Sequence, residues 1–329
     1  MVTATVETLA RKLGLRTDHH IFFTSAGLTI ALLVLFLVFQ DWVGNAFGTG
    51  REWIVTNLGW LFIIGVTVWL LFLIWVAISK YGHLRLGEDD DRPAYSNLSW
   101  FAMLFAGGIG TVLMFWGVAE PISHFSAPPF EGVAPYSVEA SQDAMSISLY
   151  HLSLHTWAIF TLPGLAFGFF IYRYKLPMRV SSVFYPILKE RISGPIGKTI
   201  DVFAVLGTVF GLAVSLGLGT SQINAGLSEL VGLPDAVWAK VVIIGLLTVV
   251  ATISIAVGLD KGVRRLSNVN ILTAVGLMIF VLIASDTVFL LRQIIESLGM
   301  YAQDIIQLSF WNDSMAEFTS DGGWGWQGG

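Results

Sequence analysis

The sequence contains no cysteine and little charge. Among its 329 residues, 12% are Asp, Glu, Lys or Arg, about half the fraction found in a typical soluble domain. The absence of cysteine excludes disulfides, thiolate metal sites and cysteine nucleophiles. The net charge of −5 comes without a basic stripe, so nucleic acid is not an expected partner. Because 55% of the residues are hydrophobic and few charges could cover a water-facing surface, we expect the chain to be solvated by membrane lipid.

The apolar residues occur in long runs of roughly 20 residues, the length that a helix needs to cross a bilayer. The sequence therefore predicts an all-α, multi-pass membrane protein. Seven spans are expected, at 22–43, 58–79, 99–120, 146–172, 200–221, 237–258 and 269–291.

Lysine and arginine are distributed unevenly between the predicted loops. Fifteen of the 18 basic residues fall in the N-terminal tail, 1–21, and in the second, fourth and sixth loops. The other three are Arg51, Lys240 and Arg292. The positive-inside rule then predicts an inner-membrane protein whose N-terminus lies in the cytoplasm.

Beyond the seventh span, apolar residues recur at helical spacing from Ile294 to Ile306. This pattern predicts an amphipathic helix, which either lies on the outer membrane surface or packs on the protein itself. The final residues, 321–329, are rich in glycine and tryptophan and are typical of an interfacial loop. We therefore expect the chain to be the first part of a longer protein.

Three glycines, Gly107, Gly108 and Gly110, fall at the expected mid-membrane depth of the third span. Each costs about 1 kcal/mol of helix propensity relative to alanine. Non-helical backbone at that depth is tolerated only where it is buried or lines a cavity, and transporters use such breaks as binding sites. The alternative is close helix packing, which small residues also permit. The span closes on Glu120 and Pro121, where we expect the proline to stop the helix and the carboxylate to be an interfacial charge.

The fourth and fifth spans carry further polar and aromatic residues. His151 and His155 are four residues apart on one predicted helix face, but no third ligand is evident, so interhelical hydrogen bonds are expected rather than a zinc site. Trp157 and Phe160 form an i, i+3 pair that suits packing, an interfacial belt or an aromatic wall for a cation. In the fifth span, Thr208 could offer a hydroxyl to an ion.

Four segments in order, 105–121, 151–160, 208–222 and 258–270, resemble the betaine/choline/carnitine transporter family. The resemblance extends from about residue 20 to the end of the sequence. It implies a leucine-transporter-like fold of two inverted five-helix repeats preceded by two extra helices. On this basis the extra helices occupy 22–95, the first repeat 96–292 with its broken helix near 107–112, and an external amphipathic helix with a truncated loop 293–329. Because the second repeat is missing, we expect the chain to insert into a membrane without transporting on its own.

The resemblance also implies which residues bind the substrate: Gly108, Ile109, Gly110, Trp116, Trp157 and Phe160. Family betaine carriers have glycine where this chain has Val112, and some choline carriers have aspartate there. The absence of an acid favours a zwitterionic substrate that carries its own carboxylate. Leu152 and Phe160 replace an aromatic residue and a tyrosine of the family's aromatic box, so Trp157 is the expected main contact.

Sodium-coupled members of the family bind one ion through carbonyls that correspond to Ala106 and Ile109. A second ion uses two hydroxyls that correspond to Thr208 and Leu212. Leucine cannot ligate sodium, which argues against the second site in this chain.

The predicted function is a secondary active transporter that takes up quaternary ammonium compatible solutes such as glycine betaine, choline or carnitine. Sodium or protons are the expected coupling ions, no resident cofactor is expected, and the family implies a homotrimer. The alternative is a channel or a non-transporting membrane scaffold, although a channel would carry a polar stripe along several spans. An enzyme is not expected, because His151 and His155 lack a nucleophile or third ligand nearby.

Overall fold

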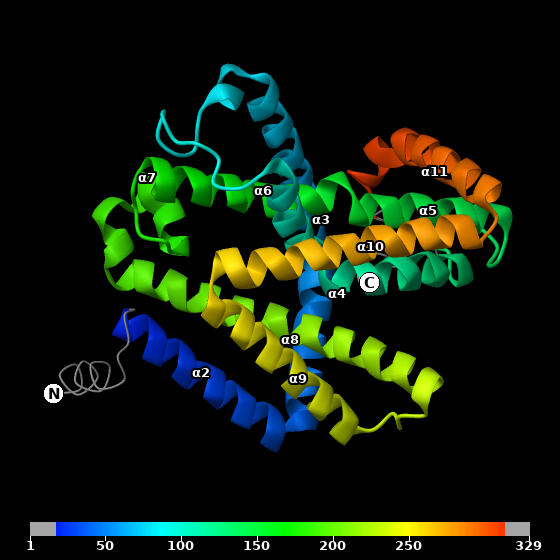
Figure 1. The fold of residues 1–329 in the computed structure, drawn as a ribbon, viewed down its shortest axis with the longest axis horizontal. Helices are drawn as coiled ribbons and strands as arrows, with labels where there is room; N and C mark the ends of the chain where they lie inside the picture. The colour runs from blue at the N-terminus through cyan, green and yellow to red at the C-terminus, as the bar shows by residue number, and fades with distance from the viewer. Residues whose placement is uncertain (1–17, 313–329) are drawn as a thin grey trace.

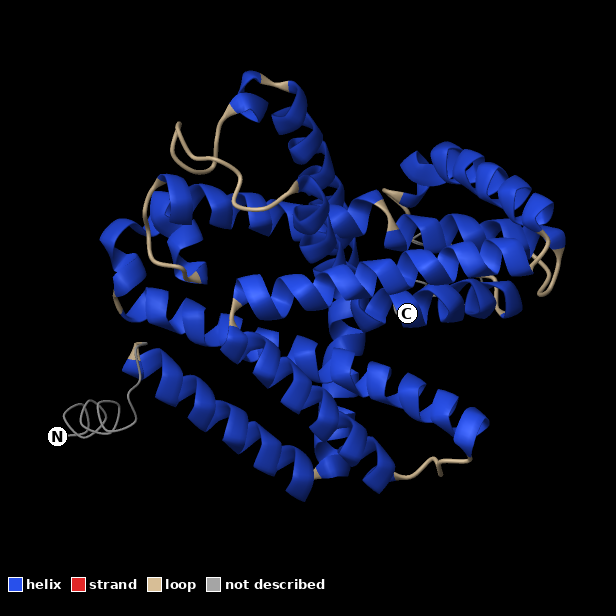
Figure 2. Cartoon of the chain, viewed as in Figure 1, coloured by secondary structure: helices blue, strands red, loops and turns tan. Residues whose placement is uncertain are grey.

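The computed structural model describes residues 18–312, without the side chains of Ile109, Thr111, Val112, Leu259 and Asp260. Within this range the chain forms helices joined by loops, and no strand occurs among the described residues (Figure 2). The basic residues of the predicted N-terminal tail and the glycine-rich loop at 321–329 lie outside the described residues.

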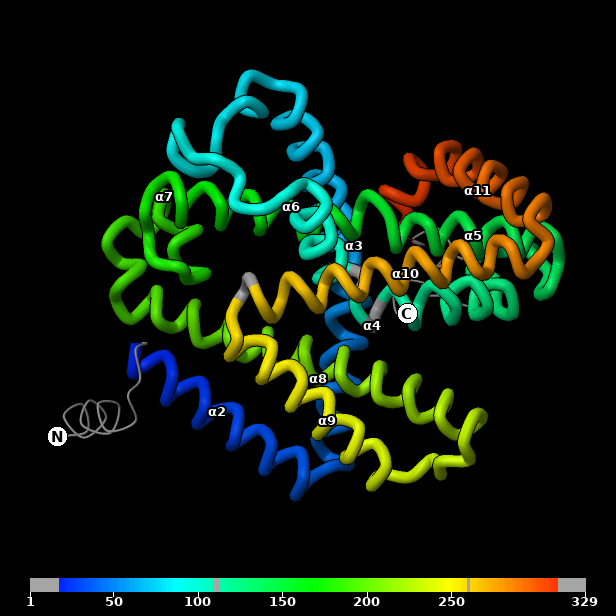
Figure 3. Tube along the Cα trace, viewed as in Figure 1, coloured from blue at the N-terminus to red at the C-terminus, as the bar shows by residue number. Residues whose placement is uncertain are grey.

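Ten α-helices follow one another along the described chain (Figure 1). They are α2 His19–Val38, α3 Gln40–Ile78, α4 Asn97–Ser126, α5 Val138–Leu152, α6 Leu154–Phe167, α7 Tyr185–Leu188, α8 Pro195–Val231, α9 Val237–Val257, α10 Arg264–Ala284 and α11 Thr287–Leu308. Two π-helical turns, Gly168–Arg173 and Leu259–Val263, extend α6 and precede α10. Figure 3 traces α2 alongside α8, α10 alongside α4, and α11 alongside α5, pairs that are in contact.

The outer surface of the helices is apolar over most of their length. Large hydrophobic side chains are exposed on several helices, among them Leu37 (64%), Leu230 (82%) and Ile283 (74%). Within residues 18–312, six helical segments are long and apolar enough to cross a membrane, and the two halves of α4 would make a seventh if they form one bent span. A continuous apolar exterior of this kind suits lipid rather than water.

Several helices extend beyond the apolar runs that predicted them. The α3 helix has 39 residues and includes the polar segment before the predicted second span, and α8 has 37 residues. Hydropathy marks the part of a helix that lies in the bilayer, whereas hydrogen bonding continues until a cap or a loop intervenes. The predicted boundaries were therefore too narrow at these helices.

The seventh span was predicted at 269–291, but the structure divides this apolar run. The α10 helix ends at Ala284, and Asp286 caps α11 by accepting a hydrogen bond from the Phe289 N–H at 3.0 Å. A carboxylate at this position satisfies an N–H group that the first turn leaves free. The amphipathic helix therefore begins at Thr287.

The α11 helix buries one face and exposes the other. Ser297, Tyr301 and Leu308 are buried where the helix packs on α5, while Ile295 and Ile306 on the other face are exposed. The packing alternative of the sequence analysis is thus correct for one face. The exposed apolar face is the part of this helix that could still contact a membrane surface.

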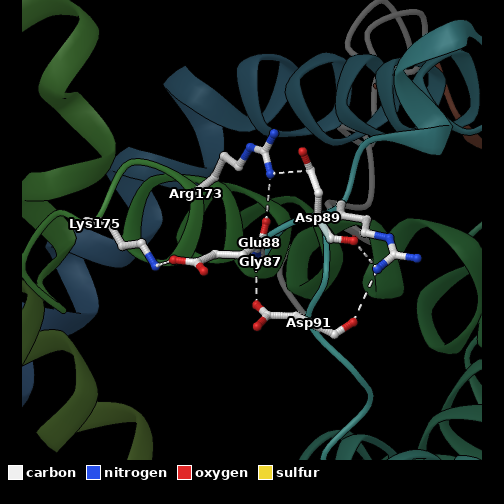
Figure 4. Close-up of polar contacts among 7 residues, drawn as sticks. Gly87, Glu88, Asp89, Asp91, Arg173 and Lys175 are labelled. Atoms are coloured by element: carbon white, nitrogen blue, oxygen red, sulfur yellow. Dashed lines mark hydrogen bonds and ion pairs between the residues drawn. The ribbon is translucent and has the colours of Figure 1, made fainter.

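Ion pairs join the second predicted loop to the fourth (Figure 4). The guanidinium of Arg173 donates to Asp89 Oδ1 at 2.7 Å and to the Gly87 carbonyl at 2.9 Å. Lys175 Nζ lies 2.5 Å from Glu88 Oε1. The hydrogen bond from Arg173 holds the pKa of the Asp89 carboxyl below its ordinary value. Both loops therefore lie at the same end of the helices.

Contacts of Asp18 and of Arg264 place the start of α2 and the sixth predicted loop at this same end of the helices. The Asp18 carboxylate lies 3.3 Å from Lys198 Nζ and 3.9 Å from the Arg179 guanidinium. The Arg264 guanidinium lies over the Tyr95 ring, 6.0 Å from its centroid. The start of α2 and the second, fourth and sixth predicted loops thus share one side, as the uneven distribution of lysine and arginine requires.

Asp18 caps the first described helix, and its loss should be measurable. Its carboxylate accepts hydrogen bonds from the N–H groups of His20 (3.0 Å) and Ile21 (3.3 Å). We expect Asp18→Ala to lower the free energy of unfolding by about 1 kcal/mol, measured by thermal unfolding of the purified protein in detergent. Asp18→Asn is the matched control, because it keeps an acceptor for the cap and should lose much less.

The cap should also depend on pH. Burial raises the pKa of Asp18, but the hydrogen bonds from Ile21 and Lys198 outweigh burial and bring the pKa below its ordinary 3.8. The carboxylate's contribution is therefore complete above the ordinary pKa and is lost as the pH falls through the lower folded-state value. A difference between wild type and Asp18→Ala that did not shrink at such low pH would contradict this role.

Candidate functional site

The α4 helix is broken where its glycines cluster. Gly110 has non-helical backbone angles (φ 5°, ψ −167°), and the segments 97–108 and 113–126 are bent by 52° relative to each other. The break lies inside the range 107–112 that the glycines indicated. In transporters, bends of this kind offer backbone carbonyls and N–H groups to a ligand.

The indole of Trp157 lies directly on the backbone just before the break. A Cβ atom placed on Gly108 would overlap Trp157 Cη2 and lie 2.5 Å from Trp157 Cζ3. Only glycine allows the six-membered ring of the indole to approach the α4 backbone this closely. The structure thus brings together two of the predicted substrate-binding residues, which are 49 positions apart in the sequence.

Aromatic rings continue on both sides of Trp157. Phe105 stacks on the indole with 6.2 Å between ring centroids and 6° between planes, and Phe101 stacks on Phe105 at 5.2 Å and 16°. Phe160 lies 5.9 Å from Trp157 at a 48° angle and is 54% exposed. The result is a row of aromatic faces along the first half of α4, and such faces attract cations. Phe101 and Phe105 were not among the predicted substrate-binding residues, although they are four residues apart in the same predicted span.

The structure does not bring the other two predicted substrate residues, Trp116 and Ile109, into the aromatic row. Trp116 lies in the second half of α4, and its ring packs edge-on against Phe115 at 5.2 Å and 84°. Ile109 precedes Gly110 at the break, but its side chain is outside the described part. The aromatic row is therefore built around Trp157, and Trp116 has a different aromatic neighbour.

The predicted sodium ligands lie on two helices. Ala106 is in the first half of α4, and Thr208 is in α8, where its hydroxyl donates to the Ala204 carbonyl at 2.8 Å. Thr208 also lines a cavity of about 680 Å³ that includes Asp18, Arg179 and Asp201. This cavity lies toward the side occupied by the start of α2. Leu212, the second member of the predicted hydroxyl pair, is 59% exposed on α8.

The fourth predicted span is interrupted between its two histidines. Ser153 (φ −108°, ψ −130°) separates α5 from α6, and the Thr156 hydroxyl donates to the carbonyl of His151, which the end of α5 leaves free. The prediction that His151 and His155 share one face of a continuous helix was therefore wrong. Nothing in the sequence around Ser153 marks this break.

The predicted interhelical hydrogen bond is present for His151, whereas His155 bonds to the residue that caps the end of α11. His151 Nδ1 contacts Glu120 Oε1 of α4. His155 Nε2 lies 3.0 Å from Ser309 Oγ, just after α11. Because the Ser309 hydroxyl donates its hydrogen to the Ile305 carbonyl at 2.5 Å, the His155 Nε2–H is the donor in this pair.

Glu120 is buried, which corrects the expectation of an interfacial charge. Its side chain is 9% exposed, and Oε1 lies 3.7 Å from His124 Nε2 as well as in contact with His151. Pro121 does not end the helix, since α4 continues to Ser126 and so brings His124 onto the face of Glu120. His124 was not predicted to join this cluster, because the proline was expected to end the helix before it. The i, i+4 spacing of Glu120 and His124 was the available signal.

Comparison with known proteins agrees with the sequence resemblance. Residues 20–329 match the family described as BCCT, the betaine/carnitine/choline family of transporters. The chain is 45% identical over 317 residues to the ectoine/glycine betaine/proline transporter EctP of Corynebacterium glutamicum, covering 96% of this chain and 51% of EctP. It is 43% identical over 281 residues to the high-affinity choline transport protein of Escherichia coli K12, covering 85% and 41% of the two chains.

A probable glycine betaine transporter of Desulfitobacterium hafniense is 39% identical over 309 residues, with 94% of this chain and 61% of the relative covered. The chain thus spans about half the length of the curated relatives it matches. The apolar helices confirm an all-α membrane protein, and the family consists of transporters rather than enzymes. On a match that covers residues 20–329, the chain belongs to the betaine/carnitine/choline family of transporters.

Proposed function

We propose that this chain forms the substrate-binding part of a secondary active transporter that takes up quaternary ammonium compatible solutes of the glycine betaine type. The observation that carries the proposal is the Trp157 indole lying on the Gly108 backbone at the break of α4. An aromatic face beside a break in the helix backbone provides the two features that a methylated cation with a carboxylate needs.

A zwitterion is the preferred substrate. The predicted binding residues, 108–110, Trp116, Trp157 and Phe160, include no acid that could neutralise a bare cation. Backbone N–H groups at the break would instead face the carboxylate of the solute. The names of the relatives cover glycine betaine, choline, ectoine and proline, so the class is broader than a single compound.

The proposed location is the cell inner membrane, with the start of α2 and the second, fourth and sixth loops in the cytoplasm. The support is the concentration of lysine and arginine on these segments. Their mutual contacts, such as Arg173 with Asp89, agree with a shared side. The homotrimer implied by the family stays a prediction.

Radiolabelled uptake by cells that express the intact gene tests the function. We expect uptake of glycine betaine, with weaker uptake of choline, across a panel of methylated ammonium compounds, and no uptake in cells lacking the gene. Equal fluxes of all the compounds in both directions without an ion gradient would favour a channel. Absence of uptake for the whole panel would favour a non-transporting scaffold.

Sodium dependence provides a separate test of the coupling proposal. Ala106 and Ile109 carbonyls are the proposed ligands of one ion, whereas Leu212 leaves Thr208 without a second hydroxyl in the predicted pair. If sodium is the coupling ion, uptake should rise hyperbolically with its concentration. A clearly sigmoidal curve would contradict the single site, and uptake that follows the proton gradient without sodium would point to protons.

A further inference from the structure

We propose that Glu120, His124 and His151 form a binding site for a divalent transition metal, with zinc as the best-suited ion. The three residues come from α4 and α5, past the break of α4. The aromatic row uses none of them, so the proposal does not depend on the transported solute.

The donor atoms already converge. One ligand atom from each residue lies within 4.8 Å of the other two, and Glu120 Oε1 is 3.7 Å from His124 Nε2. Two donors that each lie about 2.1 Å from a tetrahedral zinc are about 3.4 Å apart. Small side-chain rotations that move the donor atoms of Glu120 and His124 by a few tenths of an ångström would bring them to this separation. The His151 ring would have to move away from its present contact with Glu120.

The chemistry of the set suits zinc. Two imidazoles and one carboxylate are a combination found in zinc sites that keep a fourth position for water. The side chains of Glu120 and His124 are 9% and 8% exposed, so a bound ion would be shielded, while His151 is 34% exposed. His151 also lines a cavity of about 280 Å³, whose other lining residues are mainly apolar, among them Val55, Phe62 and Ile159.

Helix geometry holds the ligands in place. Glu120 and His124 are one turn apart on α4, and the Thr156 hydroxyl fixes the His151 carbonyl where α5 ends. A metal bound to all three side chains would join the second half of α4 to the end of α5. It would replace the hydrogen bond between His151 and Glu120 with two stronger bonds to one ion.

Equilibrium dialysis of the purified chain in detergent against zinc chloride, with the metal counted by mass spectrometry, tests the site. We expect one zinc ion per chain at micromolar zinc, and at least about tenfold weaker binding in Glu120→Gln, His124→Ala and His151→Ala, since even the loss of a group that only orients a metal ligand costs that much. His155→Ala is the matched control: it removes a buried imidazole four residues from His151 that is held by Ser309, and it should bind zinc as wild type does. His83→Ala controls for exposed histidines.

X-ray absorption at the zinc edge needs no variant and keeps the test decisive if a substitution prevents folding. Two imidazoles and one carboxylate in the first coordination sphere of the wild type are the expected result. No stoichiometric binding up to millimolar zinc would overturn the proposal. So would a spectrum without imidazole scattering, or wild-type affinity in folded His124→Ala and His151→Ala.

Discussion

Replacing Trp157 by alanine is expected to raise the apparent KM for the solute tenfold or more. The amount of the variant protein in the membrane should equal that of wild type. A cation held against an aromatic face in a desolvated site gains about 2 kcal/mol, and a loss of 1.4 kcal/mol is already a tenfold change. In this chain the indole is the central ring of the aromatic row, between Phe105 and Phe160. No other residue in the row could replace its contact with Gly108.

The measurement is the concentration dependence of labelled glycine betaine uptake by cells that express the intact gene. Trp157→Phe keeps an aromatic face and should fall between wild type and Trp157→Ala. Trp238→Ala on α9 is the control, because Trp238 is 58% exposed on the helix surface and should leave KM unchanged. An unaltered KM in Trp157→Ala would remove Trp157 from the binding site.

The helix content and the position of the break could be predicted because both depend on local composition. Apolar runs of roughly 20 residues require helices in lipid, and three glycines within four residues weaken one helix at a defined depth. Trp157 could be proposed only through the family resemblance, since tryptophan in an apolar span is usually a packing residue. Its contact with Gly108 depends on the tertiary packing of α4 against the segment around α6, which no pattern in either span encodes.

The features missed from the sequence share a physical cause. Pro121 normally ends a helix, but neighbouring helices in a membrane protein can satisfy the freed carbonyl, and α4 continues to Ser126. Burial of Glu120 follows from this continuation, because it places His124 beside the carboxylate and turns both toward α5. At the break at Ser153, the Thr156 hydroxyl donates to the His151 carbonyl, and such a side-chain hydrogen bond competes with the helix and leaves no trace in hydropathy.

Gly108→Ala is expected to reduce uptake by at least an order of magnitude, whereas Gly107→Ala should have little effect. The new methyl group at position 108 would occupy the space of the Trp157 ring, so either the indole or the α4 backbone would have to move. Phe105 stacks on the indole from one side and limits that movement. A displaced indole no longer faces the break, and a misplacement of about 1 Å can cost a hundredfold in function.

The neighbouring glycine provides the matched control. A Cβ atom on Gly107 meets no heavy atom within 4 Å, and alanine is the better helix former by about 1 kcal/mol, so Gly107→Ala should fold at least as well as wild type. Uptake and surface amount are measured together for both variants.

A double substitution then isolates the contact itself. The atoms that would collide with alanine at position 108 are Trp157 Cη2 and Cζ3, at the far end of the indole, and phenylalanine does not reach as far. If the collision is the cause, Gly108→Ala should be less harmful in a Trp157→Phe background than in wild type, which gives a favourable coupling energy in the double-mutant cycle. Additive losses would mean that Gly108 acts through the backbone break rather than through the indole, and normal uptake by Gly108→Ala would separate the break in α4 from solute binding altogether.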